Sequence, residues 1–399
     1  MITFAEAVAQ VAKRTPPASA EEVPLDAAAG RLLAGTVESR LDHPRFDATS
    51  KDGWAVCSDQ TFPARLRVLG TLAAGRVAPG SVGVGETMKI MTGAPVPSGA
   101  DAVVPVEEAV EEAGSVAIDA PPRPGAHIRR RGEVVAGGAP LLEAGVFLTP
   151  VRIAAAAAAG RRSLRVVRRA RAGLLVTGEE IASSAAGPGP GQIPDSNGPL
   201  LRAALAREGC ETTDLGVCRD DLAELTSRLG AAAKLGLDLL VTTGGVSAGD
   251  FDLVSAALRS LGAEIVFHKV SMRPGKPTLF ALLGPTLLFG LPGNPVSAAV
   301  GFDLFVRGAL RVRAGLPPLP APIDAALLAP VRNRGRRLAL LPGCLHFAGG
   351  TVGVEPIPTL GSHDLLAQSR ADALFAVPGE TSLRAGEVVE AYPISRDWA

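Results

Sequence analysis

Hydrophobic positions recur at helical spacing in two short stretches of the first half of the chain. Residues 3–14 repeat apolar side chains every three or four positions, and Thr3 with Glu6 forms the sequence pattern of a capping box. Residues 154–159 are all alanine, which has the best intrinsic helix propensity. The pattern predicts a short amphipathic helix at the start of the chain and a second helix around the alanine run, with a domain boundary near Arg168.

Between residues 170 and 315 the pattern changes to continuous apolar runs that alternate with amphipathic stretches. The runs have the composition of strands covered on both faces, and they lie at residues 173–176, 239–241, 265–267, 279–283 and 287–291. The helical stretches between them lie at about residues 198–209, 222–235, 252–261 and 296–313, the third ending at Gly262. Helical crossovers join parallel strands, so this region is predicted to be a doubly wound α/β domain.

Two other regions are rich in short apolar runs, glycine and proline. Residues 41–136 read as a strand-and-turn module. After the proline-rich link at residues 315–322, short alternating runs separated by glycines predict a small, separate all-β module.

Composition narrows the class of protein. The chain has 399 residues with 40 basic and 40 acidic side chains, so its charge favours neither nucleic acid nor an anionic membrane as a partner. Its four cysteines form no C-x-x-C pair, which argues against a zinc site or a disulfide framework. The uncharged residues 277–302 are interrupted by prolines and glycines, so two buried strands and a turn fit better than a membrane span. No basic segment precedes an apolar stretch at the amino terminus, and we expect a cytoplasmic protein.

The residues that follow the predicted strands are candidates for chemistry, because ligands bind outside the carboxyl ends of strands in a doubly wound sheet. Gly244 and Gly245 would let the backbone approach an anion such as a phosphate, although an ordinary strand-to-helix turn capped by an aspartate explains an isolated loop of this kind better. Glu180, Asp220 and Asp252 lie on three different loops of one rim, and their hard oxygen ligands suit Mg²⁺ bound between carboxylate and substrate phosphate.

Basic residues mark a second candidate region. Lys269, Arg273 and Lys276 cluster around residues 271–277, where two prolines restrict the backbone. An oxyanion site and a solvated basic loop are about equally good interpretations of this spacing. Residues 290–295 read as a rigid turn that shapes a pocket wall.

Three further segments read as turns or carry no clear chemistry by themselves. From the turn-forming residues beside them alone, the segments around Asp52 and Thr92 are interpreted as turns. Residues 362–364, Ser-His-Asp, are consecutive and cannot supply the geometry of a hydrolase triad.

These residues occur in ordered motifs by which the chain resembles the molybdopterin molybdenumtransferases, a family that includes the carboxy-terminal domain of gephyrin, over essentially its whole length. The motifs are Ser-Lys-Asp-Gly-Trp-Ala-Val at 50–56, Ile-Met-Thr-Gly-Ala-Pro-Val-Pro at 90–97, Arg-Arg-Arg-Gly-Glu at 129–133, Gly-Gln-Ile-Pro-Asp-Ser-Asn at 191–197, Thr-Gly-Gly-Val-Ser-Ala-Gly at 243–249, Arg-Pro-Gly-Lys-Pro at 273–277 and Gly-Leu-Pro-Gly-Asn-Pro at 290–295.

The resemblance implies an elongated homodimer whose active cleft lies between the α/β domain of one subunit and the amino-terminal module of its mate. It implies four domains: a discontinuous amino-terminal domain at 1–41 and 137–168, a strand-rich module at 42–136, an α/β molybdopterin-binding domain at 169–315 and a β-barrel-like domain at 316–399. The implied reaction takes adenylyl-molybdopterin and molybdate as substrates, needs Mg²⁺, releases AMP and forms molybdenum cofactor. Contacts with the molybdopterin adenylyltransferase and with recipient molybdoenzymes are implied as well.

The residue patterns and the resemblance together give fourteen candidate site positions, of which the resemblance carries over Asp52, Thr92, Glu180, Asp220, Asp252, Lys269, Lys276 and Ser362 residue by residue. The catalytic positions are Asp52, Thr92, Glu180, Asp220, Asp252, Lys269 and Lys276, with Glu180, Asp220 and Asp252 also holding the metal. The substrate-binding positions are Gly244, Gly245, Ser247, Arg273, Pro292, Pro295 and Ser362.

Some positions depart from the family pattern, and two other functions compete with the transferase. Arg273 replaces a usual lysine, Lys51 a usual methionine and Trp54 a usual tyrosine, while Val134 and Pro342 stand where an acid and an arginine are expected. The alternatives are an enzyme that adenylates molybdopterin and a noncatalytic carrier of molybdopterin or molybdate. The modules flanking the α/β domain favour the transferase, and the retained acidic residues argue against a carrier.

Overall fold

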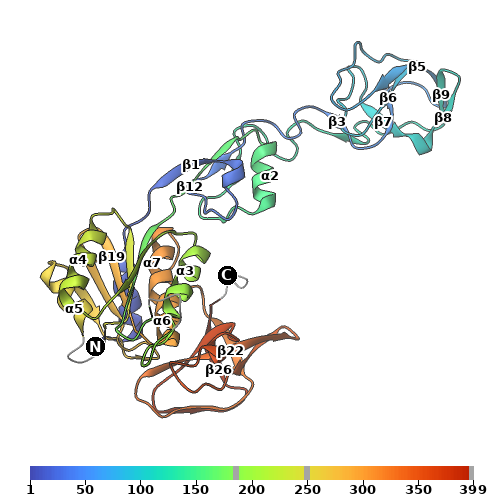
Figure 1. Ribbon diagram of the computed structural model, residues 1–399. Coiled ribbons are helices and arrows are strands. Elements are labelled where there is room, and N and C mark those ends of the chain that lie inside the picture. Colours follow the sequence, from blue (N-terminus) through green and yellow to red (C-terminus); the bar gives the residue numbers. More distant parts are fainter. Residues whose placement is uncertain (183–187, 247–251, 395–399) are drawn as a thin grey trace. The chain divides into compact units, whose positions relative to one another are not determined.

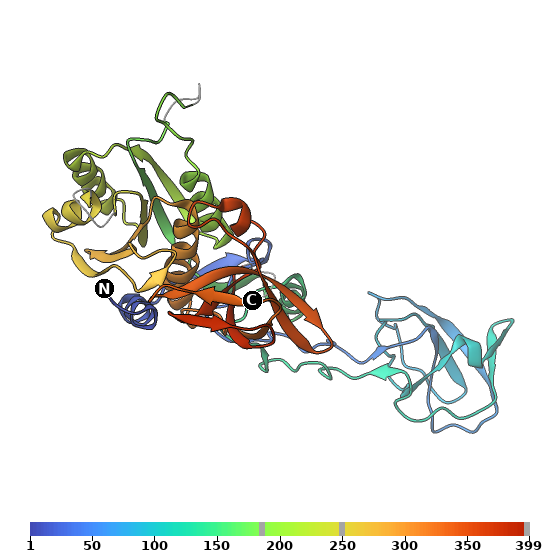
Figure 2. The ribbon, with the colours of Figure 1, turned by 90° about the horizontal axis from the view of Figure 1, so that it is seen from below.

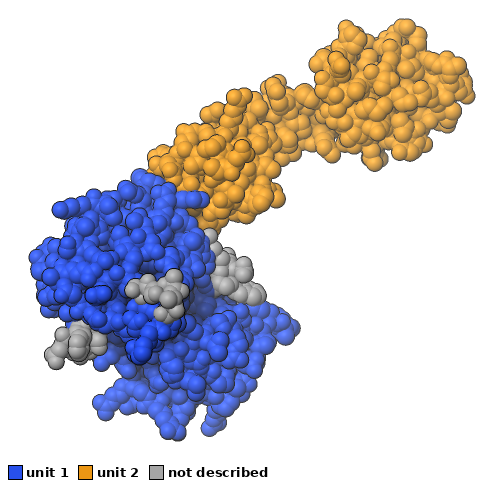
Figure 3. Space-filling view, in the orientation of Figure 1, with its two compact units in different colours: residues 1–19, 168–399 blue, residues 20–167 orange. Residues whose placement is uncertain are grey.

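The computed structural model describes residues 1–182, 188–246 and 252–394. Two compact units divide the chain: unit 1 comprises residues 1–19 and 168–399, and unit 2 comprises residues 20–167 (Figure 3). Within the described residues, no helix is both long enough and apolar enough to cross a membrane.

Unit 1 is built around a six-stranded sheet. Its spatial order is β14 (Glu211–Cys218), β13 (Arg171–Thr177), β15 (Leu239–Thr243), β19 (Thr286–Leu291), β18 (Leu279–Leu283) and β16 (Glu264–His268). The first four strands are parallel, which confirms the predicted α/β domain. β18 runs antiparallel to both neighbours, in agreement with the two buried strands and a turn predicted within residues 277–302. Only Gly284 and Pro285 separate it from β19, and so short a link permits a hairpin but no helical crossover.

Helices cover both faces of this sheet (Figure 1). One face packs against α4 (Leu222–Ala233) and α5 (Leu253–Ser260). The other packs against α1 (Phe4–Arg14), α3 (Asn197–Arg207), α6 (Pro295–Gly301), the π-helical turn η3 (Phe302–Val306) and α7 (Arg307–Arg313). The nearly continuous apolar strands are therefore buried on both sides, as their composition predicts.

The first helix belongs to unit 1 together with the α/β domain. The resemblance implies instead that residues 1–41 belong to the amino-terminal domain. The predicted capping box is present, because the Thr3 hydroxyl accepts from the Glu6 backbone while the Glu6 carboxylate accepts from the Thr3 backbone. Ala7 and Val11 are buried in the core of unit 1, and the ring of Phe4 lies 6.3 Å from that of Phe305. The apolar face that the sequence pattern predicts thus covers η3 and α7.

The carboxy-terminal strands of unit 1 close into a small barrel (Figure 2). Its five strands pair in a ring, in the order β22 (Leu338–Ala348), β23 (Thr351–Pro356), β20 (Ile323–Leu327), β26 (Val388–Pro393) and β24 (Ala373–Val377), with β24 pairing back to β22. This ring confirms the predicted β-barrel-like domain. The short β17 (Met272–Arg273) pairs with β22 and attaches the barrel to the basic segment of the α/β domain. A two-stranded ribbon, β21 (Val331–Asn333) with β25 (Thr381–Leu383), and the short α8 (Leu365–Gln368) complete the region.

Unit 2 is strand-rich, as predicted for the amino-terminal modules. One part pairs β1 (Ala20–Pro24) with β12 (Ser163–Val167) and β2 (Val37–Glu38) with β11 (Pro140–Leu142), beside η1 (Leu25–Ala27) and α2 (Pro150–Ala158). The other part has the six-stranded order β7 (Ala102–Pro105), β4 (Gly53–Val56), β6 (Glu86–Ile90), β5 (Ala64–Leu72), β9 (Ser115–Ile118) and β8 (Val110–Glu112), with η2 (Val106–Glu108) after β7. β3 (Ala48–Thr49) pairs with β10 (Ile128–Arg129) where the chain enters and leaves this part.

Candidate active site

The strand directions of unit 1 bring most predicted site residues to one edge of the sheet. The carboxyl ends of the parallel strands β13, β14, β15 and β19 share this edge. β16 also ends there, because it is separated from β19 by two antiparallel pairings. The loops that carry Glu180, Asp220, Asp252 and Lys269 therefore leave the sheet at the same edge, where a doubly wound fold binds its ligands.

The glycine pair after β15 is required by the backbone. Gly244 and Gly245 have φ angles of +90° and +61°, and a Cβ atom on Gly244 would lie 2.2 Å from the carbonyl oxygen of Thr177. The Gly244 N–H donates to the carbonyl oxygen of Leu291 at 3.1 Å, which ties this turn to the end of β19. Ser247, predicted to bind substrate, lies outside the described residues.

The three predicted metal ligands occupy different environments. Asp252 caps α5 by accepting from the Ser255 N–H at 3.4 Å, and its Oδ2 lies 3.3 Å from Nδ1 of His268 at the end of β16. Asp220 has a buried Oδ1 with no hydrogen-bond partner, whereas Glu180 is exposed. Within residues 1–182, 188–246 and 252–394, no three acidic, histidine or cysteine side chains gather closely enough to hold a metal ion. The assignment of Mg²⁺ to these carboxylates stays a prediction.

His268 was not predicted. The only signal for it in the sequence is its place directly after an apolar run, which is where site residues occur in this fold.

The basic segment carries uncompensated charge. In the described part of the chain, Lys269, Arg273 and Lys276 form no ion pair with a carboxylate. Lys269 has a φ of +99°, which is rare for a residue with a side chain. Backbone hydrogen bonds hold it on both sides: its N–H donates to the Thr278 carbonyl at 3.0 Å, and its carbonyl accepts from the Ile2 N–H at 3.2 Å. These backbone bonds, one of them from Ile2 two residues before α1, thus fix the direction in which the Lys269 side chain leaves the backbone.

The turn after β19 meets the barrel at the same edge. Pro292 is buried, and Pro295 starts α6, where its missing N–H costs nothing. The next residue, Val296, donates its N–H to the carbonyl oxygen of Ser362 at 3.1 Å. Ser362 is therefore brought to the predicted proline turn although it lies 66 residues after Val296 in the chain.

Asp52 and Thr92 form a second, separate group in unit 2. Oδ1 of Asp52 accepts from the backbone N–H of Thr92 at 2.6 Å and from its hydroxyl at 2.7 Å. These two bonds, the backbone one first, lower the pKa of Asp52 below its ordinary value. The structure thus joins two residues 40 positions apart into one exposed group with a stable negative charge.

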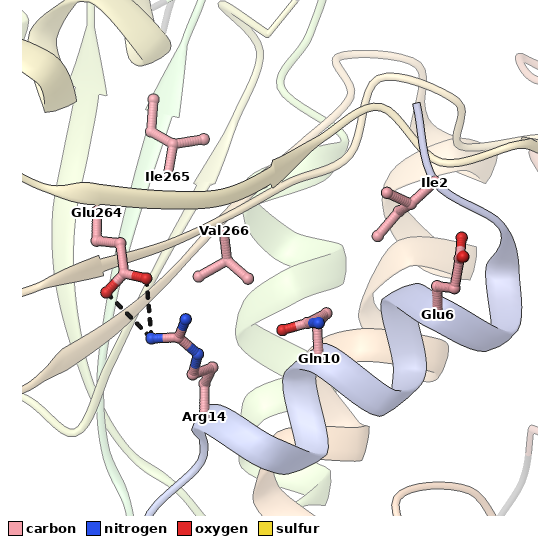
Figure 4. Close-up of a pocket in the computed structure, with 7 residues that line it drawn as sticks. All are labelled: Ile2, Glu6, Gln10, Arg14, Glu264, Ile265 and Val266. Atoms are coloured by element: carbon pink, nitrogen blue, oxygen red, sulfur yellow. Dashed lines mark hydrogen bonds and ion pairs between the residues drawn. The ribbon is translucent and has the colours of Figure 1, made fainter.

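A pocket of about 390 Å³ lies elsewhere, between α1 and the edge strand β16 (Figure 4). Glu6 and Gln10 line it from the helix, and Arg14 closes one end through an ion pair of 2.8 Å with Glu264. None of the predicted site residues lines this pocket.

Comparison with known proteins identifies the family. The profile "MoeA N-terminal region (domain I and II)" matches residues 2–160, "Probable molybdopterin binding domain" matches 173–312, and "MoeA C-terminal region (domain IV)" matches 324–394. The chain is 38% identical to molybdopterin molybdenumtransferase 2 of Mycobacterium tuberculosis, over 89% of this chain and 90% of the relative. It is 32% identical to the molybdopterin molybdenumtransferase of Staphylococcus aureus, over 98% of this chain and 94% of the relative.

A solved structure of a molybdopterin biosynthesis MoeA protein from Pyrococcus horikoshii superposes with a TM-score of 0.85 at 30% sequence identity. The superposition covers 99% of each chain. The chain therefore belongs to the MoeA family of molybdopterin molybdenumtransferases.

Proposed function

We propose that this protein is a molybdopterin molybdenumtransferase, an enzyme that inserts molybdenum from molybdate into molybdopterin. The observation that carries the proposal is the match of three family profiles, in order, along residues 2–160, 173–312 and 324–394. Relatives bearing that enzyme's name align over 89–98% of the chain. The strand edge of unit 1, which carries glycine turns, carboxylates and cations without carboxylate partners, supports the proposal as the surface that would bind the substrates.

The substrate in this proposal is adenylyl-molybdopterin. The two dithiolene sulfurs displace oxygen from molybdate, which leaves as water with the thiol protons; one water molecule cleaves the phosphoanhydride, so that AMP leaves and molybdenum cofactor remains. The described residues offer no activated nucleophile at the edge, and none is needed if positioning and charge neutralisation lower the barrier.

Glu180, Asp220 and Asp252 are the residues that would hold Mg²⁺. The buried, unpartnered Oδ1 of Asp220 is the feature that fits a cation, because a buried carboxylate oxygen is costly without a donor or a metal. Mg²⁺ is usually bound through one or two carboxylates plus waters and substrate phosphates, so the lack of a three-ligand group among the described residues is compatible with it. When bound, the ion would offset charge on the phosphate oxygens.

The basic segment would bind the anionic part of the substrates. Lys269 and Lys276 have no carboxylate partner in the described structure, so their charge is available to a phosphate or to molybdate. Arg273 is exposed on β17. It presents a planar guanidinium group at a position where the family usually has the smaller ammonium group of a lysine. Gly244 and Gly245 would allow a phosphate to approach the backbone closely.

Asp52 and Thr92 would act in a homodimer, contacting the pterin or the metal of the partner subunit's substrate. Their hydrogen-bonded pair is exposed and preorganised, which supports a binding role. We place the enzyme in the cytoplasm, where it would receive substrate from a molybdopterin adenylyltransferase and deliver product to recipient molybdoenzymes.

The test is release of AMP from purified adenylyl-molybdopterin, with and without molybdate and Mg²⁺. The native protein should release AMP only when molybdate is present. Asp252→Asn should abolish release while keeping α5 intact, because asparagine also caps helices well. Asp221→Asn is the matched control: Asp221 caps α4 at the same edge, accepting from the Glu224 N–H at 2.7 Å, and its variant should keep full activity.

Two outcomes would contradict the proposal. Binding of adenylyl-molybdopterin without any AMP release would favour a carrier. Formation of adenylyl-molybdopterin from ATP and molybdopterin, with no molybdate-dependent step, would favour an adenylyltransferase.

A further inference from the structure

A buried amide outside the predicted set connects three loops at the strand edge. Asn197, the first residue of α3, is 6% exposed. Its Nδ2 donates to Oγ1 of Thr243 at 2.9 Å and to the carbonyl oxygen of Gly293 at 2.7 Å. The Thr243 hydroxyl in turn donates to the carbonyl oxygen of Pro292 at 3.1 Å. One side chain thus links the start of α3, the end of β15 and the turn after β19.

The orientation of this amide follows from its partners. A backbone carbonyl can only accept, so the atom facing Gly293 is the NH₂ group. The other end, Oδ1, is buried and has no hydrogen-bond partner. An unsatisfied buried acceptor costs free energy, and a structure that retains one does so most readily at a functional site.

Asn197 is not needed to start its own helix. The carboxylate of Asp195 already accepts from the Gly198 N–H at 2.8 Å in the first turn of α3. Both donor bonds of Asn197 leave the helix and end on other loops. The side-chain hydrogen bonds of Asn197 therefore connect separate loops and do not cap its own helix.

We propose that Asn197 is a positioning residue that holds the Gly244–Gly245 turn and the Pro292–Pro295 turn in fixed register for the substrate. The inference rests on the proposed function, because Gly244 and Gly245 are assigned there to phosphate binding; Pro292 and Pro295 are among the substrate-binding residues predicted from the sequence. The Gly244 N–H already donates to the Leu291 carbonyl at 3.1 Å, and the amide adds a second link beyond the strand ends. Preorganised turns lose less entropy on binding, so removal of the link raises KM more than it lowers kcat.

The central variant is Asn197→Asp, which keeps the volume and removes both donor hydrogens. Thr243→Val removes the hydroxyl of the same network at nearly constant shape, while Thr243→Ser keeps the hydroxyl and should rescue the phenotype. Leu205→Val is the structural control: Leu205 is fully buried in the same helix, has no polar group to join the hydrogen-bond network, and its variant lowers Tm without changing substrate binding.

Two readouts separate positioning from general destabilisation. The first is steady-state AMP release from adenylyl-molybdopterin, in which Asn197→Asp raises KM about tenfold, the size expected for losing one or two buried hydrogen bonds, and changes kcat less. The second is amide hydrogen exchange of the full chain without substrate, in which peptides covering residues 239–246 and 288–296 exchange faster. Thr243→Val follows Asn197→Asp in both, and the double variant is no worse than Asn197→Asp alone.

Each outcome decides the proposal. Unchanged exchange in both peptides, or an unchanged KM in an active enzyme, overturns it, as does a Leu205→Val variant that reproduces the same KM and exchange changes. If the native protein releases no AMP while Asn197→Asp still loosens both peptides, the proposed function fails and the link between the turns stands.

Discussion

Asp238 is the residue whose replacement should destabilise unit 1 most clearly. Its carboxylate accepts from Arg168 Nη2 at 2.8 and 2.9 Å, from Arg313 Nη2 at 2.7 Å and from the Arg171 N–H at 2.8 Å. Burial alone would raise the pKa of Asp238, but the Arg171 N–H and the two guanidinium groups outweigh it and hold this pKa below the ordinary value. The carboxylate is therefore charged in the folded protein, and both of its oxygens accept hydrogen bonds.

The expected loss of stability on Asp238→Asn follows from the burial of the Asp238 and Arg313 side chains. The side chains of Asp238 and Arg313 are 14% and 8% exposed, so Asp238→Asn leaves a buried arginine without its counter-charge. Breaking a buried pair costs about 3–5 kcal/mol, and because Arg168 is 31% exposed and can be solvated, we take the lower end, about 3 kcal/mol. At roughly 2–4 °C per kcal/mol for a unit of this size, Tm should fall by about 6–12 °C.

The assay is differential scanning calorimetry of the full chain at pH 7, following the transition of unit 1. Glu380→Gln is the control, since the pair of Arg336 and Glu380 is 92% and 65% exposed and such pairs contribute about 0–1 kcal/mol. An Asp238→Asn shift no larger than that of the control would refute the reasoning.

The pH dependence gives a second check on Asp238. Because its folded pKa is lower than the unfolded value of about 3.9, its stabilising contribution is complete above that unfolded value and is lost as pH falls through the folded one. The stability difference between the native protein and Asp238→Asn should be constant from pH 6 to 8 and shrink below about pH 4. A difference that grows toward acid pH would contradict the assignment.

Three other variants test separate parts of the structure. Asp52→Asn should reduce AMP release severely while leaving Tm unchanged in calorimetry; since the pKa of Asp52 is lowered, the native pH profile above pH 5 should show no titration of this group. Gly244→Ala should abolish AMP release and lower Tm by more than Gly262→Ala, because both glycines have positive φ but only Gly244 would place a Cβ 2.2 Å from the Thr177 carbonyl; equal Tm losses would count against this. Thr3→Ala should cost about 1 kcal/mol in denaturant unfolding by removing the helix cap, whereas Thr3→Ser should keep it.

Local features of the fold could be predicted from the sequence. The capping box of Thr3 and Glu6, the two buried strands at 277–302 and the glycine turn after β15 all depend on residues close together in the chain. Spacing alone reads the surroundings of Asp52 and Thr92 as two turns, and the resemblance gives both residues a role without predicting that they are hydrogen-bonded to each other, as the structure shows.

Features that depend on distant partners could not be predicted. Nothing near Phe4 indicates that its helix would pack on Phe305, because the apolar face of a helix does not specify its partner. Asn197 read as part of a motif before a helix, and only the folded chain shows that its amide reaches Gly293.

The central claim is tested most directly by reconstitution of a cofactor-free molybdoenzyme. The purified protein, adenylyl-molybdopterin, molybdate and Mg²⁺ should together restore activity to the apoenzyme, and omission of either the protein or molybdate should prevent it. Failure of the complete mixture, when preformed molybdenum cofactor activates the same apoenzyme, would contradict the assignment of this chain as a molybdenumtransferase.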